Sequence, residues 1–327
     1  MQLNEEALEV LQHHYYPRAK WLQNNCNWNT ISYTGSEANA EINDPLMQHC
    51  EIYDCFTRNA AGFSNVLQDL KFGSKTPKWH AQDALTRITS EGNDSINWPL
   101  QTWLYAFLCH RITGSGASFQ DDHGYRNSVV RYWGRLSTID DMKECLVEAK
   151  AKKIAIFTSI GNQPPSPKKG VSNIDFMVKE LPMLIVELTE WLQERKRGHK
   201  EIVDYLNNYN ISNGHRRFNF AYAAFSMDIS DYYPELVDEY SHTYLGNNAI
   251  RCMKLMSRGY KTDAFMDILT NLTGGKAKDL EDVMCDFVRY GQNYDPFKRG
   301  RHFNNSPINF IKKYGWEDRS GTISYAL

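Results

Sequence analysis

The stretch from Arg111 to Asn127, RITGSGASFQDDHGYRN, combines small residues with charged ones and is the strongest candidate for chemistry. Its small residues, including Ser115 and Ser118, would let backbone amides approach an anion or a flat ring closely. Asp122 and His123 could then serve as a base or as metal ligands. A structural alternative is a helix C-cap followed by an aspartate N-cap with solvated charges.

A second candidate segment runs from Phe157 to Pro165 and is rich in neutral polar groups. Ser159, Asn162 and Gln163 are hydrogen-bond donors and acceptors on an expected turn. Such groups can read the edge of a base or hold a substrate amide. The alternative is a turn that satisfies its own backbone, as Asn and Ser often do.

A third candidate segment runs from His215 to Asp238 and carries charges beside aromatic residues. Arg216 and Arg217 suit a phosphate backbone or a pyrophosphate. Asp228 and Asp231 are three residues apart, so they can share a helix face and bind a cation or a substrate amine. We expect Arg217 to lie on the same face as Asp228. An amphipathic helix with surface ion pairs is the alternative.

Basic clusters lie at 168–169, 195–200 and 298–302. Residues 1–150 hold 13 Lys and Arg against 18 Asp and Glu, whereas residues 151–327 hold 24 against 21. A surface for a polyanion is therefore expected in the second half of the chain, although a charge run is often only a solvated face.

The composition bounds the class of protein. Of 327 residues, 42% are apolar, which is enough for a sizeable core. The seven cysteines form no CxxC pair, which argues against a zinc cluster or a secreted disulfide framework. The N-terminus has no pattern of a signal peptide, and no apolar run approaches 18 residues, so no membrane association is expected.

The elements that must position these residues are helices. Pro99 opens a helix at 98–111, with Leu100, Trp103 and Phe107 at helical spacing. We predict a mainly α fold, a helical bundle with little or no sheet, as a single domain over 1–327 that can divide into two lobes near 160–172. Further helices are expected at 4–24, 123–136, 172–195, 198–208, 215–230, 246–258, 262–273 and 277–291. Another is expected to begin at a cap on Thr138 or Asp140 and to end at about Lys152.

The order of the motifs resembles a known family. RITGSGASF, HGYRN, TSIGNQPP, FSMDISDYYPELVD and YLGNNA follow one another between residues 111 and 249. This order resembles the phage amino acid:DNA transferases, also called alpha-glutamyl/putrescinyl thymine pyrophosphorylases, which act in thymidine hypermodification. The resemblance covers roughly residues 98–290. It implies a helical fold like that of DNA glycosylases and a location in the cytoplasm of an infected bacterium.

The resemblance also implies a reaction. The substrate would be double-stranded DNA bearing 5-hydroxymethyluracil activated as a pyrophosphate ester, and glycine, a similar amino acid or another amine would displace the pyrophosphate. Asp122 or Asp228, with His123 as alternate, would take the amine proton. Cations would stabilise the departing pyrophosphate, with or without Mg²⁺. The expected substrate-binding residues are Arg111, Ser115, Ser118, Arg126, Asn127, Ser159, Asn162, Gln163, Arg216, Arg217 and Asp231.

Three other classes of function remain open. A helical DNA glycosylase acting on modified bases would use Asp228 or Asp238 to activate water, but the chain lacks an LPGVG hairpin. A non-enzymatic DNA-binding module would bind DNA with no chemistry to lose. A metal-dependent hydrolase would use the Asp and His clusters, but the sequence has no HExxH motif.

Overall fold

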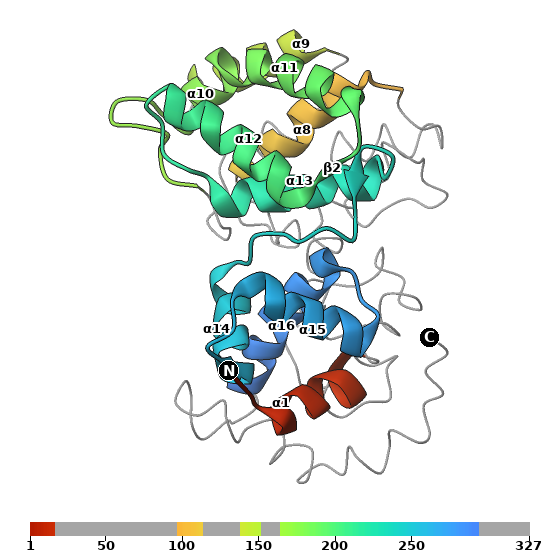
Figure 1. Ribbon diagram of the computed structural model, residues 1–327. Helices are drawn as coiled ribbons and strands as arrows, with labels where there is room; N and C mark the ends of the chain where they lie inside the picture. The colour runs from red at the N-terminus through yellow and green to blue at the C-terminus, as the bar shows by residue number, and fades with distance from the viewer. Residues whose placement is uncertain (17–96, 114–137, 152–163, 294–327) are drawn as a thin grey trace, which may run out of the picture. The chain divides into compact units, whose positions relative to one another are not determined.

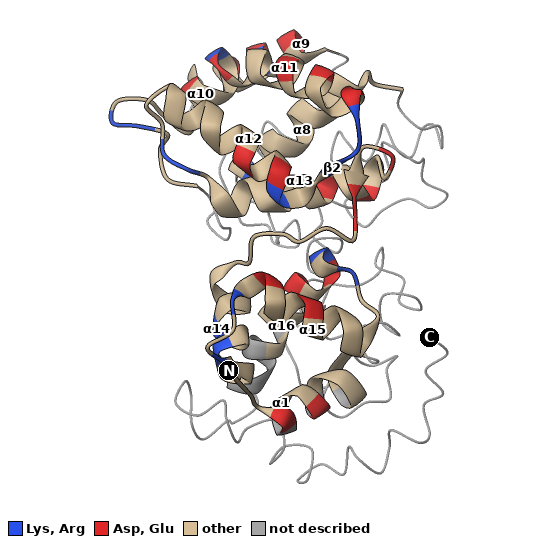
Figure 2. Ribbon diagram, viewed as in Figure 1, with Lys and Arg blue, Asp and Glu red and all other residues tan. Residues whose placement is uncertain are grey.

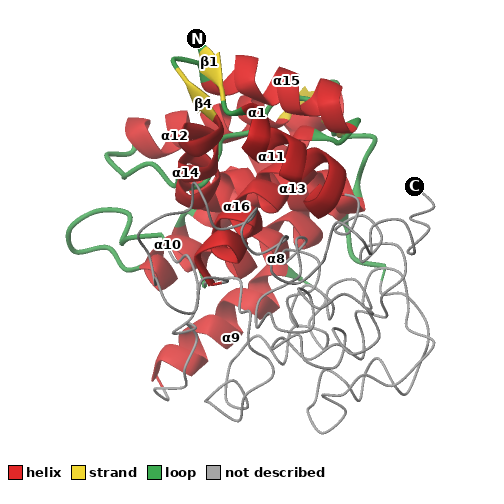
Figure 3. Cartoon of the chain, turned by 90° about the horizontal axis from the view of Figure 1, so that it is seen from below, coloured by secondary structure: helices red, strands yellow, loops and turns green. Residues whose placement is uncertain are grey.

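The computed structural model describes residues 1–16, 97–113, 138–151 and 164–293 (Figure 1). Helices dominate these ranges, and each named strand has only two residues (Figure 3). The prediction of a mainly α fold with little sheet is therefore confirmed. None of the helices in the described ranges is both long and apolar enough to cross a membrane.

The chain divides into two compact units. The first contains the described residues 1–16 and 245–293, and the second contains 97–113, 138–151 and 164–244. Residues 164–172 lie within the second unit, and the chain passes from one unit to the other after Tyr244. The first unit is therefore assembled from both ends of the chain.

The second unit is built around α8, which spans Leu100–Ile112. Every residue from Thr102 to Ile112 is buried, so α8 is a core helix with no solvent-facing stripe. The other helices of the unit are α9 (Ile139–Ala151), α10 (Asn173–Lys179), α11 (Leu181–Glu194), α12 (His199–Ser212) and α13 (Asn219–Tyr232), and a short parallel pair joins β2 (Arg197–Gly198) to β3 (Val237–Asp238).

The helix expected over 172–195 is two helices. The first, α10, begins after Ser172, whose hydroxyl accepts from the backbone N–H of Asp175 at 3.1 Å. The chain turns at Glu180, and α11 follows with Pro182 in its first turn. Proline has no N–H and its ring clashes with the preceding turn of a helix, so Pro182 favours the start of a new helix over continuation of the first.

The helix expected over 215–230 begins later, at Asn219. Two buried asparagines of α12 hold the irregular segment before it. Asn210 donates to the backbone oxygen of Arg216 at 2.8 Å, and the Asn207 side chain accepts from the backbone N–H of Phe218 at 2.9 Å. Since these amides satisfy backbone groups that a helix would have paired, the segment is fixed without being helical.

The first unit contains α1 (Glu5–Glu9), a π-helical turn (Val10–Tyr15), α14 (Asn247–Met256), α15 (Thr262–Thr273) and α16 (Ala277–Asn293). Strand β1 (Gln2–Leu3) pairs antiparallel with β4 (Ser257–Arg258), which ties the N-terminus to the end of α14. Tyr15 packs on Phe287 of α16 with ring centroids 5.1 Å apart. Of the helix expected at 4–24, only the part up to residue 16 is described, and the one expected at 123–136 lies outside the described residues.

Candidate functional site: a buried arginine–aspartate pair

An ion pair inside the second unit joins two of the candidate segments. The Arg111 guanidinium donates from Nε to Asp228 Oδ2 at 2.6 Å and from Nη2 to Asp228 Oδ1. Arg111 is 5% exposed and Asp228 is 6% exposed. The contact is therefore a bidentate pair shielded from solvent, the geometry for which the guanidinium fork is best suited.

Helices α8 and α13 position this pair. One turn before Arg111, Phe107 packs on Tyr232 with ring centroids 4.6 Å apart. Tyr232 lies one turn after Asp228, so the two helices run antiparallel, with residue pairs in register across them. All residues of α13 from Ala221 to Ser230 are buried. The alternative of an amphipathic surface helix with exposed ion pairs is therefore wrong, because α13 is a core helix and its ion pair is internal.

The pairing affects the roles proposed for its members. Arg111 uses two of its donors on Asp228, and both oxygens of that carboxylate accept from the guanidinium. In this arrangement each charge compensates the other. The pair is thus well placed to orient the end of α8, where the RITGSGASF motif begins. The roles of Asp228 as a base and of Arg111 as a cation for pyrophosphate stay predictions.

His110, beside Arg111, is a feature that the motif reading missed. Its side chain is buried, and burial together with the neighbouring Arg111 charge holds the pKa of His110 well below its usual range. The imidazole is therefore neutral at pH 7. The helix ends directly afterwards, where the Thr113 hydroxyl donates to the Cys109 oxygen at 2.9 Å. The predictive signal was only the run His110–Arg111 in an apolar helix.

A second buried polar contact lies between His199 and Ser226. The His199 Nδ1 atom is 3.1 Å from Ser226 Oγ, a spacing that would suit a base and a nucleophile. However, the Ser226 hydroxyl donates its one proton to the Ala223 oxygen at 2.7 Å. With the hydroxyl proton on that oxygen, the Ser226 Oγ atom can only accept from His199, and in this arrangement the serine is not activated as a nucleophile.

Asp231 lies three residues after Asp228 on α13 and is partly exposed. The spacing agrees with the expectation that both acids project from one helix. In the ranges that the structure describes, no three His, Cys, Asp or Glu side chains gather as a set that could hold a metal ion. Asp231 and Asp228 therefore form no metal centre with a third described side chain.

Arg216 and Arg217 lie away from the buried pair. Both are exposed and precede the first residue of α13. Asp228 lies nine residues further along the helix than Asn219, which is about 14 Å at the rise of an α-helix. The expectation that Arg217 shares a helix face with Asp228 is therefore wrong, because the segment held by Asn207 and Asn210 is not helical.

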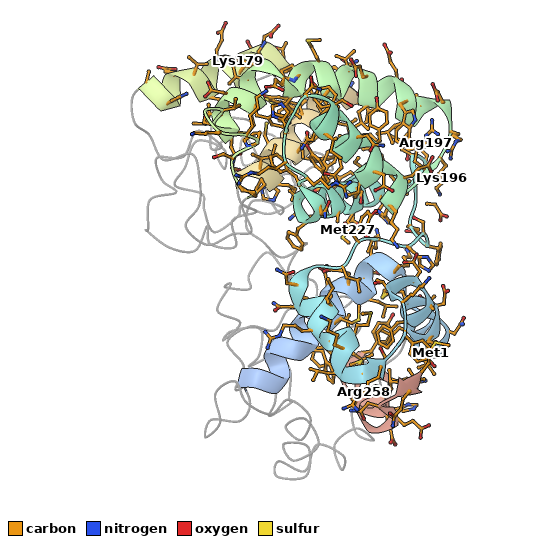
Figure 4. All side chains as sticks on the ribbon, turned by 60° about the vertical axis from the view of Figure 1, so that its left-hand side comes forward. Met1, Lys179, Lys196, Arg197, Met227 and Arg258 are labelled. Carbon is orange, nitrogen blue, oxygen red and sulfur yellow. The ribbon has the colours of Figure 1, made fainter. Side chains whose placement is uncertain are left out.

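Half of the four Lys and Arg residues in the basic cluster at 195–200 are neutralised by acids. Arg197 is buried, with its Cζ atom 4.0 Å from the centre of the Trp191 ring, and it donates to Glu194 at 2.7 Å (Figure 4). Arg195 pairs with Glu201. Two of its cations are thus paired with acids, which makes this cluster a poor polyanion surface. The cluster at 298–302 lies outside the described residues.

The other predicted site residues lie outside the ranges that the structure describes. These residues are Ser115, Ser118, Asp122, His123, Arg126, Asn127, Ser159, Asn162 and Gln163.

Comparisons of the chain with models of protein families, with curated proteins and with solved structures find no match.

Proposed function

We propose that this protein is a transferase of DNA thymine hypermodification, in which an amino acid or amine displaces pyrophosphate from 5-pyrophosphoryloxymethyluracil in DNA. The observation that carries the proposal is the Arg111–Asp228 pair. It links the first residue of the RITGSGASF motif to the FSMDISDYYPELVD motif, 117 residues away in sequence. The motifs whose order suggests the family thus meet in one place at two of their charged residues.

The pair supports a positioning role in this reaction. A buried bidentate contact fixes both helices and so the direction in which the chain leaves α8 at Thr113. A bound nucleotide must leave the base stack, and its reacting carbon must be held about 3 to 3.5 Å from the attacking amine nitrogen. We assign the proton transfer to Asp122, with His123 as alternate, and keep Asp228 as the residue that orients Arg111. Whether Mg²⁺ assists pyrophosphate departure is part of the test.

The direct experiment supplies the full chain with duplex DNA containing 5-pyrophosphoryloxymethyluracil and a mixture of amino acids and amines, with and without Mg²⁺. Digestion and nucleoside mass spectrometry should reveal an aminomethyl-type thymidine adduct and release of pyrophosphate. Asp122→Asn should abolish the adduct. Lys143→Gln is the matched control, because it removes only an exposed pair with Asp140.

Two results would contradict the proposal. Absence of any adduct from all amines refutes the transferase. Abasic sites in place of adducts would identify a glycosylase instead, since that reaction cleaves the glycosidic bond and leaves the exocyclic methylene untouched.

A further inference from the structure

Four cations gather on two adjacent turns of the second unit. Lys168 and Lys169 lie on the turn before α10, and Arg216 and Arg217 lie on the turn before α13. The backbone N–H of Arg216 donates to the Pro167 oxygen at 2.7 Å, and Lys168 Nζ donates to the Asn213 oxygen at 3.2 Å. Residues almost fifty positions apart in sequence therefore lie side by side.

Both turns are rigid. In the first, the Val171 N–H donates to the Lys168 oxygen at 3.1 Å, and Gly170 takes a positive φ of 84° that favours glycine. Prolines at 164, 165 and 167 restrict the backbone that leads into it. In the second, the backbone oxygen of Asn210 accepts from the backbone N–H of His215 at 2.7 Å, and the Asn210 side chain donates to the backbone oxygen of Arg216. The cations are thus presented on a fixed backbone.

The two turns carry no acid of their own, and Glu180 contacts His215, the residue before Arg216. Residues 164–172 and 209–227 contain no Asp or Glu. None of the four cations forms an ion pair with any side chain in the described ranges, and Lys169, Arg216 and Arg217 are exposed. By contrast, α9 carries four acids against two lysines, and α11 carries three acids and no base. Figure 2 shows blue segments in the two turns and red segments in α9 and α11.

Apolar side chains accompany the cations. Phe220, in the first turn of α13, is 37% exposed, and Ile211, at the end of α12, is 47% exposed. Guanidinium groups bind phosphate oxygens with two hydrogen bonds, and an exposed ring can stack on a base or a sugar. An unpaired positive patch with interleaved aromatic surface is typical of contacts to a nucleic-acid backbone.

We propose that the double turn of Lys168, Lys169, Arg216 and Arg217 contacts the phosphate backbone of the DNA. This inference rests on the proposed function for the identity of the nucleic acid but not for the binding itself. Four phosphate contacts contribute a slope of about −3.6 to log K against log salt concentration. Each pair of cations should therefore contribute about half of that slope.

The experiment measures binding of the full chain to unmodified duplex DNA between 50 and 200 mM salt. Arg216→Gln with Arg217→Gln, and separately Lys168→Gln with Lys169→Gln, should each lower the slope by about two. When the salt concentration rises fourfold, the factor by which affinity falls should be roughly 12 times smaller for each double variant than for the unaltered chain. Lys143→Gln with Lys179→Gln is the matched control, because both lysines already pair with acids.

An unchanged slope in both variants would overturn the proposal, as would the absence of DNA binding. Binding to vesicles of phosphatidylcholine and phosphatidylserine that needs the same four cations, without binding to DNA, would also overturn it and identify a membrane surface. Failure of the transferase assay leaves this test intact, because unmodified DNA carries the same backbone. Thermal unfolding of each variant confirms that the turns still fold.

Discussion

Removal of one member of the Arg111–Asp228 pair should be far more costly than removal of both. Asp228→Asn leaves a guanidinium that is 5% exposed without its counter-charge. The cost of such a buried, uncompensated charge is about 3 to 5 kcal/mol in free energy of unfolding. A typical domain has about 5 to 15 kcal/mol in all, so the single variant would lose a large part of its stability.

The double variant Arg111→Met with Asp228→Leu fills the same space with apolar groups. Replacement of buried ion pairs in this way is often neutral or stabilising by about 1 to 4 kcal/mol. We therefore expect the double variant to be more stable than either single variant. Urea unfolding gives the free energies, and hydrogen–deuterium exchange of peptides from α8 and α13 reports the second unit specifically.

The matched control is Lys143→Gln, which breaks an exposed ion pair and should cost about 0 to 1 kcal/mol. A cost for Asp228→Asn no larger than that of this control would show that burial of the Arg111 charge does not govern the stability of the unit. The double variant also separates stability from chemistry. If it folds and loses adduct formation on activated DNA, the pair has a positioning role beyond its contribution to the fold.

Three further predictions concern the same unit. His110 is neutral in the folded protein but gains a proton below about pH 6.5 in the unfolded chain. The free energy of unfolding should therefore fall by about 1.4 kcal/mol for each pH unit below this value. His110→Gln should reduce that dependence when unfolding is measured from pH 7 to 5. Asn210→Ala should cost about 2 kcal/mol, because it leaves the buried hydroxyl of Tyr222 without its 2.9 Å acceptor, and a cost below 0.5 kcal/mol in urea unfolding would contradict this. The Ser172 hydroxyl and, to a smaller extent, Lys150 lower the pKa of Asp175 to about 2. The contribution of the ionised Asp175 to folding stability is therefore full above about pH 4 and is lost as the pH falls through about 2. Ser172→Ala should cost about 1 kcal/mol in thermal unfolding at pH 7 and less at pH 2.

The helices were largely predictable from the sequence. Pro99 and the spacing of Trp103 and Phe107 indicated α8 to within two residues at its N-terminus and one at its C-terminus. What the spacing did not reveal was burial on every side, because polar residues such as Arg111 normally mark a solvent face. The partner that permits Arg111 inside is Asp228, and local periodicity carries no information about a residue so far along the chain.

The candidate site was predictable in its members but less so in its geometry. Their charge marks Arg111 as a candidate cation and Asp228 as a candidate base, but the sequence does not indicate that they are each other's partner. The late start of α13 depends on Asn207 and Asn210, which sequence patterns treat as ordinary helix-surface residues. The grouping of Lys168 with Arg216 depends on two other tertiary hydrogen bonds, from Arg216 to Pro167 and from Lys168 to Asn213, and so could not be deduced from the two short clusters.

In the sequence, the second unit lies between the two segments of the first unit, and this order affects how the chain folds during synthesis. The Asn4 backbone N–H donates to the Met256 oxygen at 2.7 Å, so the N-terminus completes its unit only after α14 has been synthesised. At about 5 to 20 residues per second, roughly 12 to 50 s separate the two segments on the ribosome. All residues of the second unit are synthesised before those of the first unit are complete. Biosynthesis therefore favours an order in which the second unit, which contains the Arg111–Asp228 pair, folds first. Residues 1–16 and 245–293 of the first unit then join last.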